Sequence, residues 1–253
     1  MSIYIGLDIG AVSLKLAALG APEDRPVFES LCAAQPHFRL VRTQNGAPAL
    51  PLLVISDQRP SAGSPLQAAS GLLDEVYVAA PRSSVGGIRV TGSASRPVAD
   101  ALGAHYENEF RALARMFGRF YPEVRTVFEI GASTAKYLRL EAVNGRGVLA
   151  DYGRGSDCAA GTGSFLDQQA MRMGCTAADI GDLVRTAACA PHIAGRCSVF
   201  AKSDMIHAQQ KGHTPEEILR GLCQAVALNF KAAVVKGREV AAPVALIGGV
   251  SRN

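Results

Sequence analysis

One stretch decides the fold of this chain: DIGAVSLK at residues 8–15, which returns as EIGASTAK at residues 129–136. An acid, an isoleucine, a glycine, an alanine, a hydroxyl residue and a lysine coincide at one constant offset. Around the first copy, IYIGLD at residues 3–8 and SLKLAAL from Ser13 predict two strands joined by a tight glycine turn. A supersecondary unit repeated about half a chain apart predicts two related lobes that offer the same hairpin to a shared cleft.

The two glycine turns are candidate phosphate sites, because a backbone without side chains lets N–H groups point directly at phosphate oxygens. The candidate phosphate-binding residues are Gly10, Ser13, Gly131, Ser133 and Thr134. Asp8 and Glu129 stand at the strand ends as the candidate catalytic acids. We expect them to hold Mg²⁺ through water, since that ion prefers a few carboxylates and keeps several waters. The chain has no GxxxxGK motif and therefore no P-loop.

Lys15 and Lys136 follow the turns and leave two interpretations open. Either they neutralise phosphate charge, or they are ordinary exposed lysines. Two further glycine clusters are candidate nucleotide contacts: Gly161, Thr162 and Gly163 open a predicted helix, and Gly248 and Gly249 end the predicted strand PVALIGGV. The alternative for the last pair is a simple turn.

Cys158 and Cys197 each stand just before a predicted helix, where the partial positive charge of the helix start favours a thiolate. We interpret them as metal ligands. Two thiolates do not complete a four-cysteine site, so the same pair from a symmetry-related copy would have to do so, with an iron–sulfur cluster on the dimer axis. The alternative is that both are small buried apolar residues. Cys175 and Cys189 show no CxxC spacing, and we interpret them as structural.

Composition narrows the class of protein. The chain has 253 residues, 48% of them hydrophobic and 19% charged, which is enough for two modest domains that we place at 1–122 and 123–253. The net charge of +4 comes from scattered residues and does not predict a nucleic-acid partner. Membrane spans need about 18 consecutive apolar residues, which the sequence lacks, and the N-terminus does not resemble a signal peptide. Six cysteines without regular spacing indicate reduced thiols, and we expect a cytoplasmic protein.

Five motifs together resemble a known family. They are GLDIG at Gly6, VTG at Val90, CAAGTGSF at Cys158, CSVFAKSD at Cys197 and IGGVSRN at Ile247. They are similar to the actin-like, ribonuclease H-like ATPases, whose α/β fold places two related lobes around a nucleotide cleft. Within that superfamily they resemble the activators of 2-hydroxyacyl-CoA dehydratases and the ATPase subunits of benzoyl-CoA reductase.

The resemblance implies ATP or ADP with Mg²⁺, and a 4Fe-4S cluster shared by Cys158 and Cys197 of two chains in a homodimer. It also implies that ATP turnover drives one low-potential electron into a dehydratase-like or reductase-like acceptor protein, either separate or fused. A ferredoxin-type or flavodoxin-type protein would supply the electron.

The chain departs from this family in several places. After its acid and isoleucine the family continues Gly-Gly-Gln-Asp, whereas this chain has GAST at residues 131–134. Ala11 and Val12 replace hydroxyl residues, and Lys202 replaces an acid. These changes resemble the long fused members, and the stop at Asn253 fits a module that lacks the C-terminal crossing segment. Ser133 and Thr134 favour an alternative, a regulatory nucleotide-binding module with weak or no hydrolysis. A small-molecule kinase ranks last, because residues 23–86 show no substrate pocket or catalytic base.

Overall fold

The structure is a computed structural model that describes residues 2–41, 52–143, 146–155, 161–194 and 198–252. The chain divides into two compact units, Met1–Leu113 and Ala114–Asn253. Each unit contains its own sheet, so the α/β class predicted from the sequence is confirmed.

The first unit is built on a seven-stranded sheet in the order β3-β4-β2-β1-β6-β7, with β5 paired to β2. Its strands are β1 (Ile3–Ile9), β2 (Ser13–Gly20), β3 (Phe38–Leu40), β4 (Leu52–Ser56), β5 (Arg59–Pro60), β6 (Val85–Thr91) and β7 (His105–Tyr106). Its helices are α1 (Arg25–Ala34), α2 (Pro65–Ala79) and α3 (Arg96–Leu102), with short helical turns at Pro22–Asp24 and Arg82–Ser84. Helix α4 (Glu109–Phe120) contains the division between the two units, which falls after Leu113. Strand β1 runs antiparallel to β2 and parallel to β6, which places it at the centre of the sheet.

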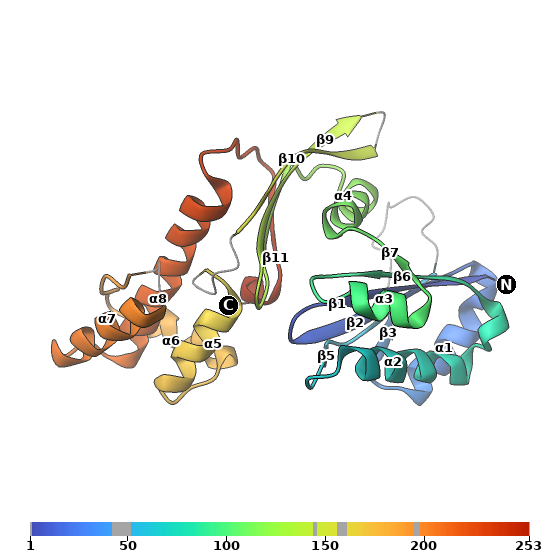
Figure 1. Cartoon of the computed structure of the whole chain (residues 1–253), viewed down its shortest axis with the longest axis horizontal. Coiled ribbons are helices and arrows are strands. Elements are labelled where there is room, and N and C mark those ends of the chain that lie inside the picture. The colour runs from blue at the N-terminus through green and yellow to red at the C-terminus, as the bar shows by residue number, and fades with distance from the viewer. Residues whose placement is uncertain (1, 42–51, 144–145, 156–160, 195–197, 253) are drawn as a thin grey trace. The chain divides into compact units, whose positions relative to one another are not determined.

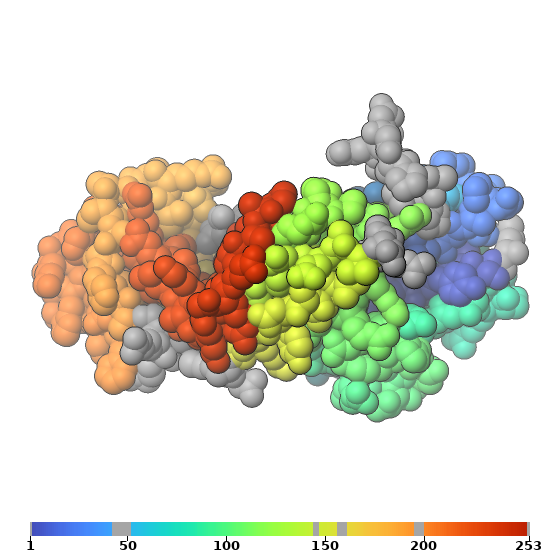
Figure 2. All heavy atoms as spheres, turned by 90° about the horizontal axis from the view of Figure 1, so that it is seen from above, coloured from blue at the N-terminus to red at the C-terminus, as the bar shows by residue number. Residues whose placement is uncertain are grey.

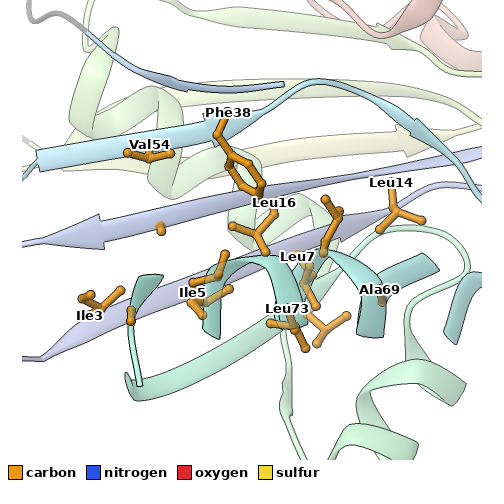
Figure 3. Packing of buried hydrophobic residues seen from close by; sticks show 14 of the residues in the cluster. Ile3, Ile5, Leu7, Leu14, Leu16, Phe38, Val54, Ala69 and Leu73 are labelled. Atoms are coloured by element: carbon orange, nitrogen blue, oxygen red, sulfur yellow. The ribbon is translucent and has the colours of Figure 1, made fainter. Parts of the chain in front are cut away.

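The core of this unit follows from alternation along β1. Ile3, Ile5 and Leu7 are buried while the intervening positions face outward, as a strand with one covered face requires. Figure 3 shows these side chains and Leu16 of β2 gathered above Leu73 of α2. Figure 1 shows α1 and α2 side by side under the sheet, and their apolar faces complete the same cluster.

The second unit has a four-stranded sheet in the order β10-β9-β8-β11, with β11 parallel to β8 and the other pairs antiparallel. The strands are β8 (Thr126–Ile130), β9 (Ala135–Val143), β10 (Arg146–Arg154) and β11 (Val244–Ile247). The helices are α5 (Gly163–Arg172), α6 (Ala177–Thr186), α7 (Ser198–Gln210) and α8 (Pro215–Phe230), followed by a π-helical segment η3 (Lys231–Val235) and a final turn η4 (Gly249–Arg252). The domain boundary expected after residue 122 stays a prediction.

Helix α8 is the central element of the second core. Thr214 and Glu217 form the predicted capping box at its start, with Pro215 in the first turn. Among the described residues, the stretch Pro215–Val235 is long and apolar enough to cross a membrane, but half of its most apolar part is buried inside the protein. Its buried face, with Leu222 and Val226, packs against α5, α6 and α7 as a core helix does.

Segment η3 then packs against β9 and β10. Figure 2 shows the yellow spheres of these strands beside the red spheres of the segments that follow α8. Phe230 and Val234 form a small cluster there with Tyr137, whose hydroxyl donates to the Glu239 carbonyl. This packing fixes one side of the β8–β9 hairpin.

Candidate functional site

The first glycine turn joins β1 to β2 as the sequence predicts. Asp8 on β1 lies opposite Lys15 on β2. Gly10 closes the turn, because its N–H donates to the Ser13 carbonyl at 2.9 Å. A Cβ on Gly10 would lie 3.1 Å from that same oxygen, so a side chain here would crowd the turn. Ser13 is braced in addition by Gln58, whose side-chain amide donates to its hydroxyl.

The second glycine turn joins β8 to β9 in the same register. Glu129 lies opposite Lys136, and the Gly131 N–H donates to the Thr134 carbonyl at 2.9 Å. A Cβ on Gly131 would meet that carbonyl oxygen at 3.3 Å, and Ser133 is exposed at the tip. The duplicated hairpin predicted from the sequence is therefore confirmed in its pairing and in its turn geometry.

The two lysines differ sharply in environment. Lys15 Nζ lies 3.8 Å from Asp8 Oδ2, and both side chains are about half exposed, at 50% and 56%. Lys136 Nζ lies 2.9 Å from Glu129 Oε2, with exposures of 1% and 20%. Surface exposure is thus the correct description of Lys15 and the wrong one for Lys136. Part of the charge of Glu129 is balanced inside the protein.

Each acid-bearing strand has a parallel neighbour that ends in a left-handed glycine. Thr91 of β6 is the partner of Asp8, and β11 pairs with β8 through Ile247 and Glu129. Both strands then continue into a glycine of positive φ, which is 109° in the first unit and 94° in the second. The two units therefore share a strand pair as well as a hairpin.

Close packing explains these two glycines. A Cβ on Gly92 would lie 2.3 Å from the Ile9 carbonyl oxygen, and one on Gly248 would lie 2.3 Å from that of Ile130. No larger residue fits such a separation. Gly249, in contrast, has no atom within 4 Å of an added Cβ, so among the described residues it is the open member of the pair suggested for nucleotide contact.

A second repeat, which the sequence reasoning missed, follows these glycines. The stretch GSASR at residues 92–96 and GGVSR at residues 248–252 place a serine at the same distance from the glycine. Ser95 Oγ donates to the Gly92 carbonyl at 2.6 Å, and Ser251 Oγ donates to the Gly248 carbonyl at 2.7 Å. These two copies are separated by a different number of residues from the two hairpins. A comparison of the sequence with itself at the offset of the hairpins therefore does not detect them.

The hydroxyl of Thr91 is the second feature that sequence reasoning missed. Its Oγ1 is buried and, in the part of the chain that the structure describes, has no hydrogen-bond partner. A buried hydroxyl without a partner is costly, so such an atom calls for a ligand or water. Because the backbone of Thr91 pairs with Asp8, the strand ends here fit a hydrated Mg²⁺ or a phosphate oxygen.

Helix α5 begins directly on the second turn. The Gly163 N–H donates to the Gly131 carbonyl at 2.8 Å, and the Ser164 N–H donates to the Ala132 carbonyl at 2.9 Å. These amides belong to the helix N-terminus, which lacks partners within the helix. Gly163 is among the residues predicted to contact nucleotide. Its amide donates to the second glycine turn and holds that turn against α5.

The other two residues of that glycine cluster are also packed. Gly161 has φ 146°, and a Cβ on it would lie 2.8 Å from the side-chain nitrogen of Asn229. Thr162 is 3% exposed. The sequence reasoning predicted the helix start correctly, and the structure adds the contacts that bring it against the turn and α8.

The predicted metal ligands Cys158 and Cys197 lie outside the described residues, and their role stays a prediction. The helices predicted to follow them are confirmed, since α5 begins at Gly163 and α7 at Ser198. Free thiols within the described ranges are Cys32, Cys175, Cys189 and Cys223.

Comparison with known proteins identifies the family. The model of the BadF/BadG/BcrA/BcrD ATPase family matches residues 5–253. The chain belongs to this family. A relative from Clostridioides difficile, named 2-hydroxyisocaproyl-CoA dehydratase activator, is 30% identical over 202 residues, which are 79% of this chain and 74% of the relative.

Other BadF/BadG/BcrA/BcrD relatives match more partially. The (R)-2-hydroxyglutaryl-CoA dehydratase activating ATPase of Acidaminococcus fermentans is 30% identical over 53% of this chain and 49% of its own length. The activator of lactoyl-CoA dehydratase from Anaerotignum propionicum is 30% identical over 52% of this chain and 49% of its own length. The alignments with these two therefore span about half of each relative.

Solved structures of the family agree with the fold. The activator of 2-hydroxyisocaproyl-CoA dehydratase from Clostridium difficile, with bound ADPNP, superposes with a TM-score of 0.71 at 26% identity, covering 99% of this chain and 81% of that one. Component A of the Acidaminococcus fermentans (R)-2-hydroxyglutaryl-CoA dehydratase gives a TM-score of 0.74 at 21% identity, with coverages of 100% and 85%. The predicted actin-like ATPase fold is thereby confirmed.

Proposed function

We propose that this chain is an ATP-dependent one-electron activator of a 2-hydroxyacyl-CoA dehydratase or a benzoyl-CoA reductase-like partner. The observation that carries the proposal is the contact between the second glycine turn and α5. It joins a phosphate-binding element to the helix that follows Cys158, through two backbone hydrogen bonds of 2.8 and 2.9 Å. An activator that couples ATP turnover to electron transfer needs such a connection.

The proposed roles of the residues follow from their positions. Gly10 and Gly131 hold turns whose backbone suits phosphate, and Asp8 and Glu129 end the strands before them. In the first unit the half-exposed carboxylate of Asp8 suits a hydrated Mg²⁺. So does the hydroxyl of Thr91, which has no hydrogen-bond partner among the described residues. The remaining proposed contacts are Ser13, Ser133, Thr134, Lys136, Gly161, Thr162, Gly163, Gly248 and Gly249.

For the cluster, we propose that Cys158 and Cys197 of two copies supply four thiolates to one 4Fe-4S centre, so that the active form is a homodimer. When bound, such a centre supplies one-electron transfer at low potential. The chain's own contribution is the start of α5 at Gly163 and of α7 at Ser198, which follow the two cysteines and whose positive helix ends favour negative charge. A ferredoxin-type or flavodoxin-type donor and a cytoplasmic location complete the proposal, and the free thiols of the described residues suit a reducing compartment.

The coupling has an energetic requirement. Nucleotide states can shift α5 only if they bind its alternative positions with different affinity, and a few kcal/mol of difference suffices. A phosphate bound by the turn at Ala132 would draw on the same backbone that accepts from Ser164. We therefore expect the presence or loss of the γ-phosphate to be felt at the start of α5.

A second candidate function is a regulatory nucleotide-binding module. It is favoured by residues 131–134, which lack the amide and the acid of the family motif, and by the close pairing of Glu129 with buried Lys136. An acid already matched by a lysine is a weaker metal ligand than an unmatched one. In this case the chain would bind ATP with little turnover.

Anaerobic purification tests the proposal. We expect about four irons per dimer and a visible absorbance that bleaches on reduction, both lost in Cys158→Ala. Cys175→Ala is the matched control, because Cys175 is a free thiol of the same unit outside the proposed cluster. Phosphate release from ATP should fall strongly in Asp8→Asn. A colourless monomer that binds ATP without releasing phosphate would overturn the activator and support the regulatory module.

A further inference from the structure

Three potential metal ligands converge at the start of α8. Cys189 lies in the segment between α6 and α7, His213 immediately precedes the α8 cap, and Glu217 is in the first turn of α8. Cys189 Sγ lies 3.6 Å from His213 Nδ1, and His213 Nδ1 lies 2.8 Å from Glu217 Oε2. All three ligand atoms lie within 4.8 Å of one another.

The segment that carries Cys189 is held in place on both sides. Before it, Arg220 of α8 donates to the Ala187 carbonyl at 2.7 Å. After it, the Pro191 carbonyl lies so close to α8 that a Cβ on Gly221 would be 2.3 Å from its oxygen. Because these contacts fix the backbone on each side, the thiol meets His213 and Glu217 without a large rearrangement.

The opposite side of the cluster is equally fixed. Glu217 Oε2 accepts from the Thr214 N–H at 3.3 Å, and Thr214 Oγ1 accepts from the Glu217 N–H at 3.4 Å, which is the capping box of α8. His213 precedes the cap, and its Nδ1 lies 2.8 Å from Glu217 Oε2 across the first turn of the helix. Both side chains are mostly buried, at 29% and 15% exposure, whereas Cys189 is exposed. One side of the cluster therefore opens to solvent.

We propose that Cys189, His213 and Glu217 bind a zinc ion whose fourth position is taken by water. Thiolate, imidazole and carboxylate are the three ligand types that zinc accepts. With zinc–sulfur and zinc–nitrogen distances of about 2.3 and 2.0 Å, a tetrahedral site separates the two atoms by about 3.5 Å, which the observed Cys189 to His213 distance of 3.6 Å matches.

Binding requires an adjustment between His213 and Glu217. A tetrahedral site separates imidazole nitrogen from carboxylate oxygen by about 3.3 Å, so the 2.8 Å hydrogen bond between His213 and Glu217 must open by a few tenths of an ångström. The thiolate and the carboxylate together balance the charge of the ion. The ion would clip the segment ahead of α7 to the start of α8, independently of the ATPase function proposed above.

Hydrogen bonding to Glu217, followed by desolvation, raises the pKa of the Cys189 thiol. A divalent cation that binds here must therefore displace the thiol proton, and the three converging ligand atoms provide its coordination.

The test is metal binding by the full chain carrying Cys158→Ser and Cys197→Ser, so that the thiols proposed for the cluster do not contribute. We expect about one zinc per chain after exhaustive dialysis, and a four-coordinate cobalt spectrum with a thiolate charge-transfer band. Adding Cys189→Ser should abolish the charge-transfer band and weaken zinc binding at least about tenfold. Adding His213→Gln should weaken zinc binding by a similar factor. The thiolate charge-transfer band of the cobalt form should remain, with reduced intensity.

Cys175→Ser in the same background is the matched control, because Cys175 is also a free thiol with a raised pKa but lies outside the cluster. Its stoichiometry and cobalt spectrum should match those of the parent. The proposal is overturned if the parent retains no zinc and gives only an octahedral cobalt spectrum. It is equally overturned if Cys189→Ser and Cys175→Ser bind zinc alike.

Discussion

Lys136 Nζ lies 2.9 Å from Glu129 Oε2 in the second hairpin, with only 1% of the lysine side chain exposed. The equivalent pair in the first hairpin, Lys15 and Asp8, is separated by 3.8 Å and half exposed. The two units therefore use the same pair of positions in different ways. A buried pair contributes to stability mainly because the loss of one partner leaves the other charge uncompensated.

Lys136→Met should destabilise the second unit by about 2–4 kcal/mol, because Glu129 would remain largely buried and lose its ammonium neighbour. Lys15→Met, the matched control, should change stability by less than about 1 kcal/mol, as exposed pairs do. Urea unfolding followed by circular dichroism measures both. Combining Lys136→Met with Glu129→Gln should cost less than the sum of the two single changes, and strict additivity would contradict a direct interaction.

Gly248→Ala should destabilise the chain by about 3 kcal/mol, because the new Cβ meets the Ile130 carbonyl and the backbone is held at positive φ. Gly103 separates these two causes. Its φ is 60°, but no atom lies within 4 Å of an added Cβ, so Gly103→Ala should cost only about 1 kcal/mol. Thermal unfolding of the two variants measures how much stability each substitution costs. Equal losses would mean that the contact with Ile130 relaxes easily.

The sequence predicts the two hairpins and α8 well, because each depends on short-range signals. Asp8 and Glu129 sit in copies of one motif, and Thr214 with Glu217 forms a capping box visible within four residues. The contact of Cys189 with His213 depends instead on how a segment without regular structure crosses α8, and spacing alone assigns Cys189 a structural role.

The same distinction applies to the nucleotide contacts. That Gly163 would start a helix follows from its glycine-rich neighbourhood, but its hydrogen bond to Gly131 joins residues far apart in the chain. The Thr91 hydroxyl, which has no partner among the described residues, is likewise placed beside Asp8 only by the pairing of β6 with β1. The roles of Cys158 and Cys197 stay predictions, because both lie outside the described residues.

Helix α6 should lose part of its stability in acid. Thr176 donates to Asp179 from its hydroxyl at 2.6 Å and from its backbone N–H at 2.8 Å, and these bonds lower the pKa of the Asp179 carboxyl. A lowered pKa in the folded state gives a contribution that is present above the normal aspartate pKa and is lost as pH falls through the folded value. The protection factors of the α6 amides, in which the slower intrinsic exchange in acid is divided out, should therefore fall below about pH 4.

Two variants test the origin of this acid effect. Asp179→Asn should lower the protection factors of the α6 amides at neutral pH. It should also remove most of the fall of these factors in acid. Asp182→Asn removes another carboxylate from the same helix. Asp182 and its partner Arg185 are both exposed, so this variant should leave the acid response of α6 in place. If both variants behaved alike, general charge and not the cap would explain the effect.

The hydrogen bond from Gly163 to Gly131 predicts how nucleotide binding reaches α5. Gly163→Pro removes the donor at a position where helices tolerate proline, since the preceding Thr162 is already extended. Gly163→Ala introduces a comparable Cβ against the Gly131 oxygen but keeps the N–H, which makes it the matched control. Relative to alanine, proline should cost about 1 kcal/mol of stability for the lost hydrogen bond.

On the proposed function, an ATP analogue should change hydrogen exchange along α5 in the wild type and in Gly163→Ala, and much less in Gly163→Pro. Equal responses in the two variants would show that the signal takes another route, even if the chain proves to be an ATP-dependent activator.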